Sequence, residues 1–466
     1  MLNSSMTRDQ RFVLTIAILA SFVAFLDGSV INVALPAISS ELGGGLSTQQ
    51  WVVDAYLITL GSLILLAGSL SDVFGRLVVL RIGLIGFGLT SLFIALAPSA
   101  ELLIVLRGVQ GIAGALLVPS SLALIMSTFR GTAQAHAIGQ WTAWTSAAFI
   151  VGPVLGGAFV DLVSWRLVFA INVIPIVITM WLLMKLGHRD ERTEHSRIDF
   201  VGAALGIVGL GGPVFALIEQ GNLGWGSPAV LVPLVVGVLS FVAFIVWQQR
   251  ATQPMLPLEL FRHRNFSMGN IATFFIYGAL GLGGFIVVVY LQEVAGYSAT
   301  FAGFAFLPSS IGIILLSSFF GRLSGKHGPR FFMTLGPFLG GVGYLTFLGI
   351  GESVNYVTQV LPGVLLFSVG LAMTVAPLTS AILGAISTKQ AGIGSAVNNA
   401  VSRIAGLITV ALIGVLTVGS LSPTNFHRLV IVTAALLFAG SLISLVGIRN
   451  PPRTVGESSD IAPPLA

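Results

Sequence analysis

The chain has 466 residues, of which 55% are hydrophobic and only 8% charged, and its formal net charge is +5. A soluble domain carries roughly 25% charged residues, so the composition excludes that class. Apolar runs of about 20 residues match a helix that spans a bilayer, whereas barrel strands would alternate over about 10 residues. The composition therefore predicts an all-α polytopic membrane protein that has the lipid bilayer as its main partner.

Several function classes are disfavoured by what the sequence lacks. Cysteine is absent, which excludes disulfides, thiolate nucleophiles and cysteine-ligated metals. The basic residues are dispersed among short loops, so we expect no nucleic-acid partner. We find no nucleotide-binding loop, metal constellation or nucleophile with a paired base. We therefore expect no cofactor, no metal and no enzymatic activity.

Fourteen apolar runs are long enough to span a membrane. The polar residues 1–11 lead into a run too long for a signal peptide, so we interpret that run as an uncleaved first span. The predicted spans cover residues 12–37, 50–70, 78–98, 101–128, 137–162, 167–186, 199–219, 228–248, 266–292, 299–320, 331–350, 355–384, 391–419 and 427–448.

The distribution of basic residues predicts the orientation. An even number of spans puts both termini on the same side, and with the N-terminus inside, 18 of the 22 Lys and Arg residues are cytoplasmic. This bias agrees with the positive-inside rule. We therefore expect a multi-pass plasma membrane protein with both termini in the cytoplasm.

The longest polar stretches, 187–197 and 248–265, bracket two of the fourteen spans. Six spans precede this pair and six follow it. We predict a six-helix bundle over residues 1–187, an inserted two-helix linker over 188–260, a second six-helix bundle over 261–450 and a cytoplasmic tail over 451–466.

A short stretch after the second span of each six repeats in register. Residues 68–77 and 321–330 share a glycine, a leucine, a serine and a later glycine, each between two apolar runs. In the first copy, Asp72 and Arg76 are four residues apart, within pairing distance if the turn is helical. A repeat at the same place in the hydropathy pattern indicates that the two halves derive from one unit.

This repeated stretch resembles the loop between spans two and three in the major facilitator superfamily, specifically its fourteen-helix drug:proton antiporter branch. Gly68, Asp72, Gly75 and Arg76 match the family pattern. Val73 and Leu77 replace residues that are usually basic, and the second copy has Gly325 where the aspartate would be.

Three further motifs carry the same resemblance, which covers nearly the whole chain. Residues 26–36, which include Asp27, resemble the first-helix signature of this branch, and residues 106–111, which include Arg107, resemble the fourth-helix motif. The fifth-helix motif associated with antiporters is matched by Gly152, Pro153, Gly156 and Gly157. The resemblance implies two six-helix bundles that alternate access to a central cavity.

Asp27, Arg107 and Asp54 lie at similar predicted depth in their spans. A buried carboxylate is costly, and moving it toward or away from an arginine would change its proton affinity. We interpret Asp27 and Arg107 as a proton-coupling pair, with a static ion pair between helices as the alternative. Asp54 is close enough to the interface that we expect it to be hydrated.

The family resemblance implies that Gly68, Asp72, Gly75 and Arg76 form a latch that closes the cytoplasmic side. The alternative is an ordinary solvated loop.

Proline removes a backbone donor and glycines allow close helix approach, so the fifth span is expected to be kinked and tightly packed. Whether it also limits leak, or serves packing alone, is left open. The role of Arg403 is open too, and Glu219 and Glu293 are expected to be hydrated structural residues.

Substrate binding would use apolar and aromatic side chains of the central helices. The candidates are Phe25, Trp141, Trp144, Phe274, Tyr277 and Met373, each of which could instead face lipid or serve packing. One deep carboxylate among aromatic rings is suited to a lipophilic cation. The sequence therefore predicts a monomeric proton-coupled exporter of lipophilic, cationic small molecules in a bacterial inner membrane. A dedicated exporter of an endogenous metabolite, lipid or antibiotic is the nearer alternative, and a sensor or enzyme the more distant one.

Overall fold

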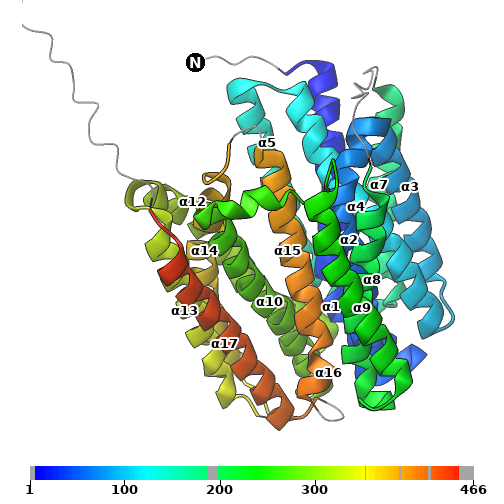
Figure 1. The fold of residues 1–466 in the computed structure, drawn as a ribbon. Helices are drawn as coiled ribbons and strands as arrows, with labels where there is room; N and C mark the ends of the chain where they lie inside the picture. The colour runs from blue at the N-terminus through cyan, green and yellow to red at the C-terminus, as the bar shows by residue number, and fades with distance from the viewer. Residues whose placement is uncertain (1–5, 187–197, 352, 388–389, 418–420, 451–466) are drawn as a thin grey trace, which may run out of the picture.

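The computed structural model describes residues 6–186, 198–351, 353–387, 390–417 and 421–450. All regular structure in these ranges is helical (Figure 1). Fourteen of the described segments are long and apolar enough to cross a membrane, which confirms the predicted fold class and number of spans. The predicted tail at 451–466 and the first ten residues of the predicted linker lie outside the described residues.

Nine spans are single helices and five are assembled from two pieces. The single helices are α1 (Arg8–Leu42), α2 (Gly45–Phe74), α3 (Arg76–Ala95), α4 (Ala100–Thr128), α5 (Gly131–Leu162), α8 (Phe200–Leu223), α9 (Pro228–Arg250), α10 (Arg264–Glu293) and α17 (Pro423–Gly447). The two-piece spans are α6 (Arg166–Ala170) with α7 (Val173–Lys185), α11 (Ala299–Phe304) with α12 (Leu307–His327), α13 (Pro329–Leu345) with η2 (Thr346–Gly349), η3 (Tyr356–Val360) with α14 (Leu361–Leu383), and α15 (Ala391–Ala411) with α16 (Ile413–Leu416). A short helix, η1 (Leu258–Arg262), precedes α10.

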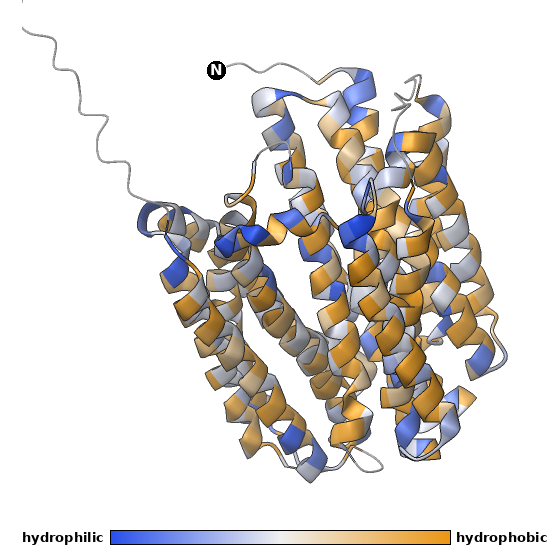
Figure 2. Ribbon diagram, in the orientation of Figure 1, coloured by the Kyte–Doolittle hydropathy of each residue, from blue (hydrophilic) through white to orange (hydrophobic). Residues whose placement is uncertain are grey.

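The hydropathy of the helices changes along their length. Apolar residues fill the middle of each span and hydrophilic residues gather at the ends and in the connections (Figure 2). Large apolar side chains also face outward, among them Ile82, Leu315 and Val446. A soluble protein rarely exposes apolar surface of this extent, and a bilayer would cover it.

The helices pack in three sets. Among the first six spans, α1 packs on α5 while α4 packs on α2 and α3; among the last six, α13 packs on α14 and α17, and α10 on α15 and α17. Helices α8 and α9 pack mainly on each other, and α8 also contacts α2 and α15. We propose that these sets are the predicted N-terminal bundle, C-terminal bundle and inserted pair.

The repeated stretch turns in the same way in both halves. Gly75 between α2 and α3 has φ 96°, and Gly328 between α12 and α13 has φ 83°. Each glycine N–H donates to the carbonyl of the serine four residues earlier, Ser71 at 3.1 Å and Ser324 at 2.8 Å. Only glycine adopts this backbone region without strain. The turns are shorter than predicted, because residues 68–74 belong to the last turns of α2 rather than to a loop.

The two bundles contact each other near the helix ends farthest from the N-terminus, the lower end in Figure 1. Helix α5 packs on α11 there, and α2 packs on α15. Gln49 of α2 donates to Glu293 of α10 at 2.6 Å, and Gln50 donates to the carbonyl of Val410 at 2.7 Å. These contacts close one end of the interface between the bundles, and we call it the closed end.

Candidate functional site

Asp27 on α1 and Arg107 on α4 form an ion pair inside the N-terminal bundle. Nη1 of Arg107 lies 2.7 Å from Oδ2 of Asp27, and each side chain is 1% exposed. Taking two charges out of water is costly, so a pair this deep needs further hydrogen bonds to be stable. The sequence placed the two residues at one depth, and the structure brings them into direct contact.

Three polar side chains that the sequence analysis did not single out complete this network. Gln110 donates to Oδ1 of Asp27 at 3.3 Å and accepts a hydrogen bond from Arg107 at 2.6 Å. Asn172, at the break between α6 and α7, donates to the same Oδ1 at 3.1 Å, and Ser91 accepts from Gln110 at 2.9 Å. The three-residue spacing of Arg107 and Gln110 on one helix was a usable signal. Ser91 and Asn172 lie in other spans, so no sequence spacing links them to Arg107 and Gln110.

The rest of the Arg107 guanidinium is also occupied. Its Nε donates to the carbonyl of Val52 at 3.0 Å, and its carbon lies 4.4 Å from the ring centre of Tyr56 and 5.7 Å from that of Phe169. A cation over an aromatic face is stabilised by the ring quadrupole. Neither side chain of the pair is accessible to a substrate, since each is 1% exposed. The arrangement holds a carboxylate that could gain or lose a proton beside an arginine that is fixed in place.

Asp54 on α2 is buried instead of hydrated, so the sequence-based expectation for it is wrong. Its side chain is 0% exposed, and neither carboxyl oxygen has a hydrogen-bond partner among the described residues. Gln50, one turn earlier, bonds the Val410 carbonyl of α15, and Gly61, seven residues later, packs on Ile404 of α15. Because these positions share one helix face, Asp54 lies on the face of α2 that packs against α15.

Arg403 on α15 has no counter-charge within the part of the chain that the structure describes. It takes part in no recorded ion pair or hydrogen bond, and its Nε is buried without an acceptor. The residue as a whole is only half-buried. Its guanidinium carbon lies 5.7 Å from the ring centre of Phe25 on α1, across the interface between the bundles.

Two of the predicted substrate residues gather around Arg403. Phe25 contacts it directly and also packs on Phe149 of α5, with ring centres 5.8 Å apart. Tyr277 of α10 lies within electrostatic range of the same guanidinium. One aromatic ring of the N-terminal bundle therefore lies against this cation, and a tyrosine of the C-terminal bundle is within its electrostatic range.

The other four candidates are dispersed. Trp141 donates to Ser21 of α1 at 3.0 Å, and Phe274 is half-buried. Trp144 is 61% exposed, with no recorded polar partner. Met373 is buried inside the C-terminal bundle against α13. In this conformation Met373 packs in the bundle interior, and the cavity role stays a prediction.

The predicted latch residues do not engage the opposite bundle in this conformation. Asp72 is half-buried and takes part in no ion pair or side-chain hydrogen bond recorded for the described residues. Arg76 begins the next helix, α3, and its charge acts on Asp72 without a recorded ion pair, while its Nε is buried without an acceptor. A Cβ at Gly68 would meet open space. The latch role of these residues stays a prediction.

The fifth-helix motif makes close contact on two sides. A Cβ at Gly152 or Gly156 would collide with side chains of α1. A Cβ at Gly157 would lie 2.5 Å from the Cα of Thr300 in α11, and the backbone of Pro153 touches the same helix. Small residues allow helices to approach this closely. The motif therefore lies at the contact between the two bundles, at the closed end.

Asp161, near the end of α5, forms a contact that the sequence analysis missed. Its Oδ1 accepts from the backbone N–H of Ala299 at 3.0 Å and its Oδ2 from that of Thr300 at 2.8 Å. These are the first N–H groups of α11, which have no partner within the helix. A carboxylate of one bundle thus caps a helix of the other.

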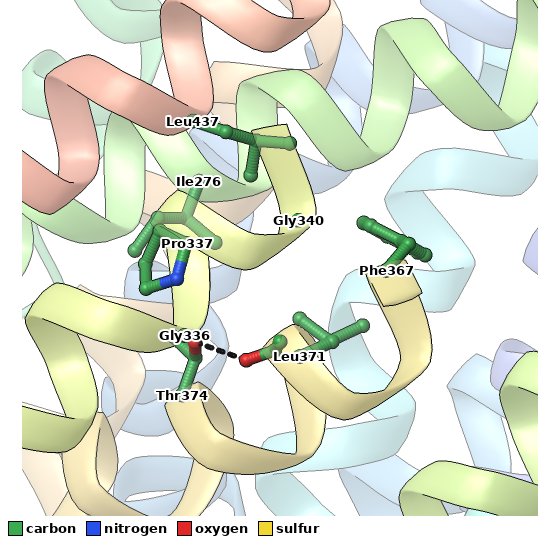
Figure 3. A pocket seen from close by; sticks show the side chains of 9 residues that line it. Ile276, Gly336, Pro337, Gly340, Phe367, Leu371, Thr374 and Leu437 are labelled. Carbon is green, nitrogen blue, oxygen red and sulfur yellow. Dashed lines mark hydrogen bonds between the residues drawn. The ribbon is translucent and has the colours of Figure 1, made fainter. Parts of the chain in front are cut away.

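Two hollows lie away from this interface. One of about 10 Å³ lies between α13 and α14 beside Pro337, Phe367 and Leu437 (Figure 3). It has room for about one water molecule, so it is too small for a drug. The other, of about 340 Å³, lies at the ends of α8 and α9 beside Asp199 and Trp247.

The chain matches known transporters along most of its length. The family model of the Major Facilitator Superfamily matches residues 17–410. The puromycin resistance protein pur8 of Streptomyces alboniger is 33% identical over 87% of this chain and 82% of that protein. The multidrug resistance protein Stp of Mycobacterium tuberculosis is 32% identical over 90% of this chain and 78% of that protein.

The fold agrees with solved structures of lower identity. A peptide transporter crystallised with sulfate superposes with a TM-score of 0.70 at 16% identity, over 96% of this chain and 95% of that one. This likeness shows the fold alone. The relatives are drug and antibiotic resistance transporters, which places this protein among transporters and not enzymes. With the family model, they show that the chain belongs to the major facilitator superfamily.

Proposed function

We propose that the protein is a proton-coupled exporter of lipophilic compounds that works by alternating access, with Asp27 as the proton site. The observation that carries this proposal is the Asp27–Arg107 pair, 2.7 Å apart and 1% exposed inside a membrane-spanning bundle. Intramembrane charges are expensive and mark function more often than stability. The relatives named for puromycin and multidrug resistance support export of drugs.

Protonation of Asp27 would change which arrangement of helices is stable. Ionised, the carboxylate holds Arg107 and accepts hydrogen bonds from Gln110 and Asn172. Protonated, it loses its attraction for Arg107, and the arginine is left without a counter-charge in low dielectric. It then becomes favourable for α1 to shift against α4 if this movement brings Arg107 to another hydrogen-bond acceptor or anion. Proton binding and conformation are linked in this way.

The contacts between the bundles assign a conformation to this cycle. If both termini are cytoplasmic, as the basic residues predict, the closed end faces outward. Asp161 and the Gly152–Gly157 segment seal that end in the present state. The unengaged Asp72 at the other end is then the expected state of an inward-open carrier.

In this proposal the proton gradient across the membrane supplies the energy for export. One proton moving inward against one monovalent cation moving outward transfers no net charge, so only the pH gradient acts, at about 1.4 kcal/mol per pH unit. A neutral substrate would also use the membrane potential, about 2.3 kcal/mol per 100 mV. We propose that the protein does this as a monomer in a bacterial inner membrane.

The predicted cationic character of the substrate stays a prediction. It relied on a deep carboxylate open to the substrate, whereas Asp27 is engaged by Arg107, Gln110 and Asn172. Export of one dedicated antibiotic or metabolite remains the second candidate. It is favoured by relatives named for single antibiotics, including a methylenomycin A resistance protein of Bacillus subtilis at 33% identity over 87% of each chain.

The test is drug-dependent proton movement in proteoliposomes with an imposed pH gradient. Wild type is compared with Asp27→Asn and with Glu101→Gln, an exposed carboxylate in the first turn of α4. We expect several unrelated lipophilic drugs to move protons through wild type and Glu101→Gln and none through Asp27→Asn. Equal flux through folded Asp27→Asn would refute the proton role, and a response to one compound only would favour a dedicated exporter.

A further inference from the structure

One cation at the interface between the bundles has no recorded ion pair among the described residues. Arg403 lies there without an ion pair or hydrogen bond among the described residues. Arg403 packs on α2, since a Cβ at Gly61 of α2 would lie 3.7 Å from the Cβ of Arg403, an ordinary van der Waals contact. Nε is buried without an acceptor, yet the residue is half-buried as a whole, so the outer guanidinium nitrogens remain accessible.

Neither Asp27 of α1 nor Asp54 of α2 forms a recorded ion pair with this cation. Asp27 is already bound by Arg107, Gln110 and Asn172. Asp54 is 0% exposed, and no hydrogen bond links it to Arg403. Arg403 is therefore a cation without a recorded counter-charge among the described residues, with its outer nitrogens accessible.

The surroundings of Arg403 are apolar and aromatic, with a second polar group close by. Phe25 of α1 lies under the guanidinium, and Tyr277 of α10 is within electrostatic range. Asn399 precedes Arg403 by four residues on α15, which puts both on one helix face. Asn399 is half-buried, and its side chain takes part in no recorded hydrogen bond, unlike Asn398, which donates to Thr273 at 2.8 Å.

We propose that Arg403, together with Asn399, is a subsite for the carboxylate of a lipophilic anionic substrate. An arginine presents a planar fork of donors that matches a carboxylate and is weakly hydrated, so it suits an anion brought into an apolar site. The aromatic rings of Phe25 and Tyr277 take the apolar part of the substrate. This inference rests on the proposed export function and replaces the cationic preference with an anionic one.

The experiment compares three ligands that share one ring system. These are 2-naphthoate, neutral 2-naphthamide and 2-naphthylmethylammonium, and their binding to the detergent-solubilised full chain is measured by calorimetry at pH 7.5. The proteins are wild type, Arg403→Gln, Arg403→Lys and the control Arg250→Gln, an exposed arginine at the end of α9. Size-exclusion elution and melting temperature confirm that each variant is folded.

We expect wild type and Arg250→Gln to bind naphthoate at least about tenfold more tightly than the ammonium, the lower end for a hydrogen bond to a charged group. Arg403→Gln should lose this preference, and Arg403→Lys should keep it with weaker binding, since lysine lacks the fork. The inference is overturned if wild type binds the ammonium as tightly as naphthoate, or binds no naphthoate. It is also overturned if folded Arg403→Gln keeps the preference.

Binding in detergent needs no proton gradient, so the two proposals fail separately. Drug-dependent proton flux with no anion preference would leave the export proposal standing and remove the Arg403 subsite. An anion preference that depends on Arg403, without any proton flux, would do the reverse. If Arg403→Gln does not fold, the ranking of the three ligands on wild type and on Arg403→Lys decides the outcome.

Discussion

The two intramembrane arginines have opposite surroundings. Arg107 is 1% exposed and has an ion pair, two further hydrogen-bond acceptors and two aromatic rings around it. Arg403 has one aromatic ring at 5.7 Å and no recorded acceptor. Arg107 is held within its own bundle by this ion pair and these acceptors. Arg403, which has no recorded acceptor and lies at the interface, is free to bind a ligand that enters between the bundles. Under the two proposals, Arg107 belongs to the proton-coupling site and Arg403 to a separate substrate site.

The largest expected difference between the two arginines is in the free energy of unfolding when each is replaced. Arg107→Gln leaves Asp27 buried without its counter-charge, and breaking a buried pair costs about 3–5 kcal/mol. Arg403→Gln removes a cation that has no partner among the described residues, so we expect a change below about 1 kcal/mol, or a gain. Chemical unfolding in detergent measures both values.

The double variant Asp27→Asn/Arg107→Gln provides the control. It removes both charges, so it should recover much of the stability that Arg107→Gln loses. Equal losses for Arg107→Gln and Arg403→Gln would contradict the contrast, since they would mean that both arginines are held equally.

A second test changes access to Arg403 without touching either arginine. In Gly157→Val a side chain meets the backbone of Thr300 and disfavours the closed end. Overpacking costs about 1–3 kcal/mol, which corresponds to roughly 5- to 150-fold in the closed-state population. Because the chain has no cysteine, Asn399→Cys can be labelled alone with an impermeant maleimide applied from outside.

We expect labelling of Asn399→Cys to speed up in the Gly157→Val background. Gly226→Cys, in the exposed turn between α8 and α9, should label at the same rate in both backgrounds. An unchanged rate for Asn399→Cys would mean that the fifth-helix motif packs the bundles without controlling access. Asp161→Asn should act in the same direction but less, because amide oxygen still accepts one of the two backbone hydrogen bonds.

The smallest expected effect concerns Asp199, a carboxylate outside the spans. Its hydrogen bonds lower its pKa. Burial alone would raise the pKa of the Asp199 carboxyl, but hydrogen bonds from the Gly202 N–H, Gln248 and Trp247 outweigh burial and lower that pKa. The folded-state pKa is below the unfolded one. The stabilisation is therefore present above the unfolded pKa of about 3.9 and is lost as the pH falls through the folded value.

The measurement is tryptophan fluorescence during acid titration, because Trp247 donates to Asp199 at 2.7 Å. Wild type should show a local transition below about pH 4 that Asp199→Asn lacks. The rest of the titration curve should be the same in both proteins. A transition that persists in Asp199→Asn would assign it to another group.

Much of the architecture could be predicted because it depends on local sequence. The fourteen spans and the family followed from run length, glycine turns and motif order, and the structure and the relatives confirm them. Gly75 and Gly328 turn alike because the same φ is required at the same place in each half. Asp54 was misplaced because hydropathy gives the depth of a residue but not the direction its side chain faces.

The sequence by itself determined how many helices cross the membrane, where the two halves repeat and at what depth Asp27 and Arg107 lie. Tertiary structure alone decided that Asn172 and Ser91 complete that pair, that Asp161 caps a helix of the other bundle, and that Arg403 is left open. The physical reason is that depth depends on distance along one helix. Partners between helices depend on the rotation of each helix about its axis, which is fixed only when all the helices pack together.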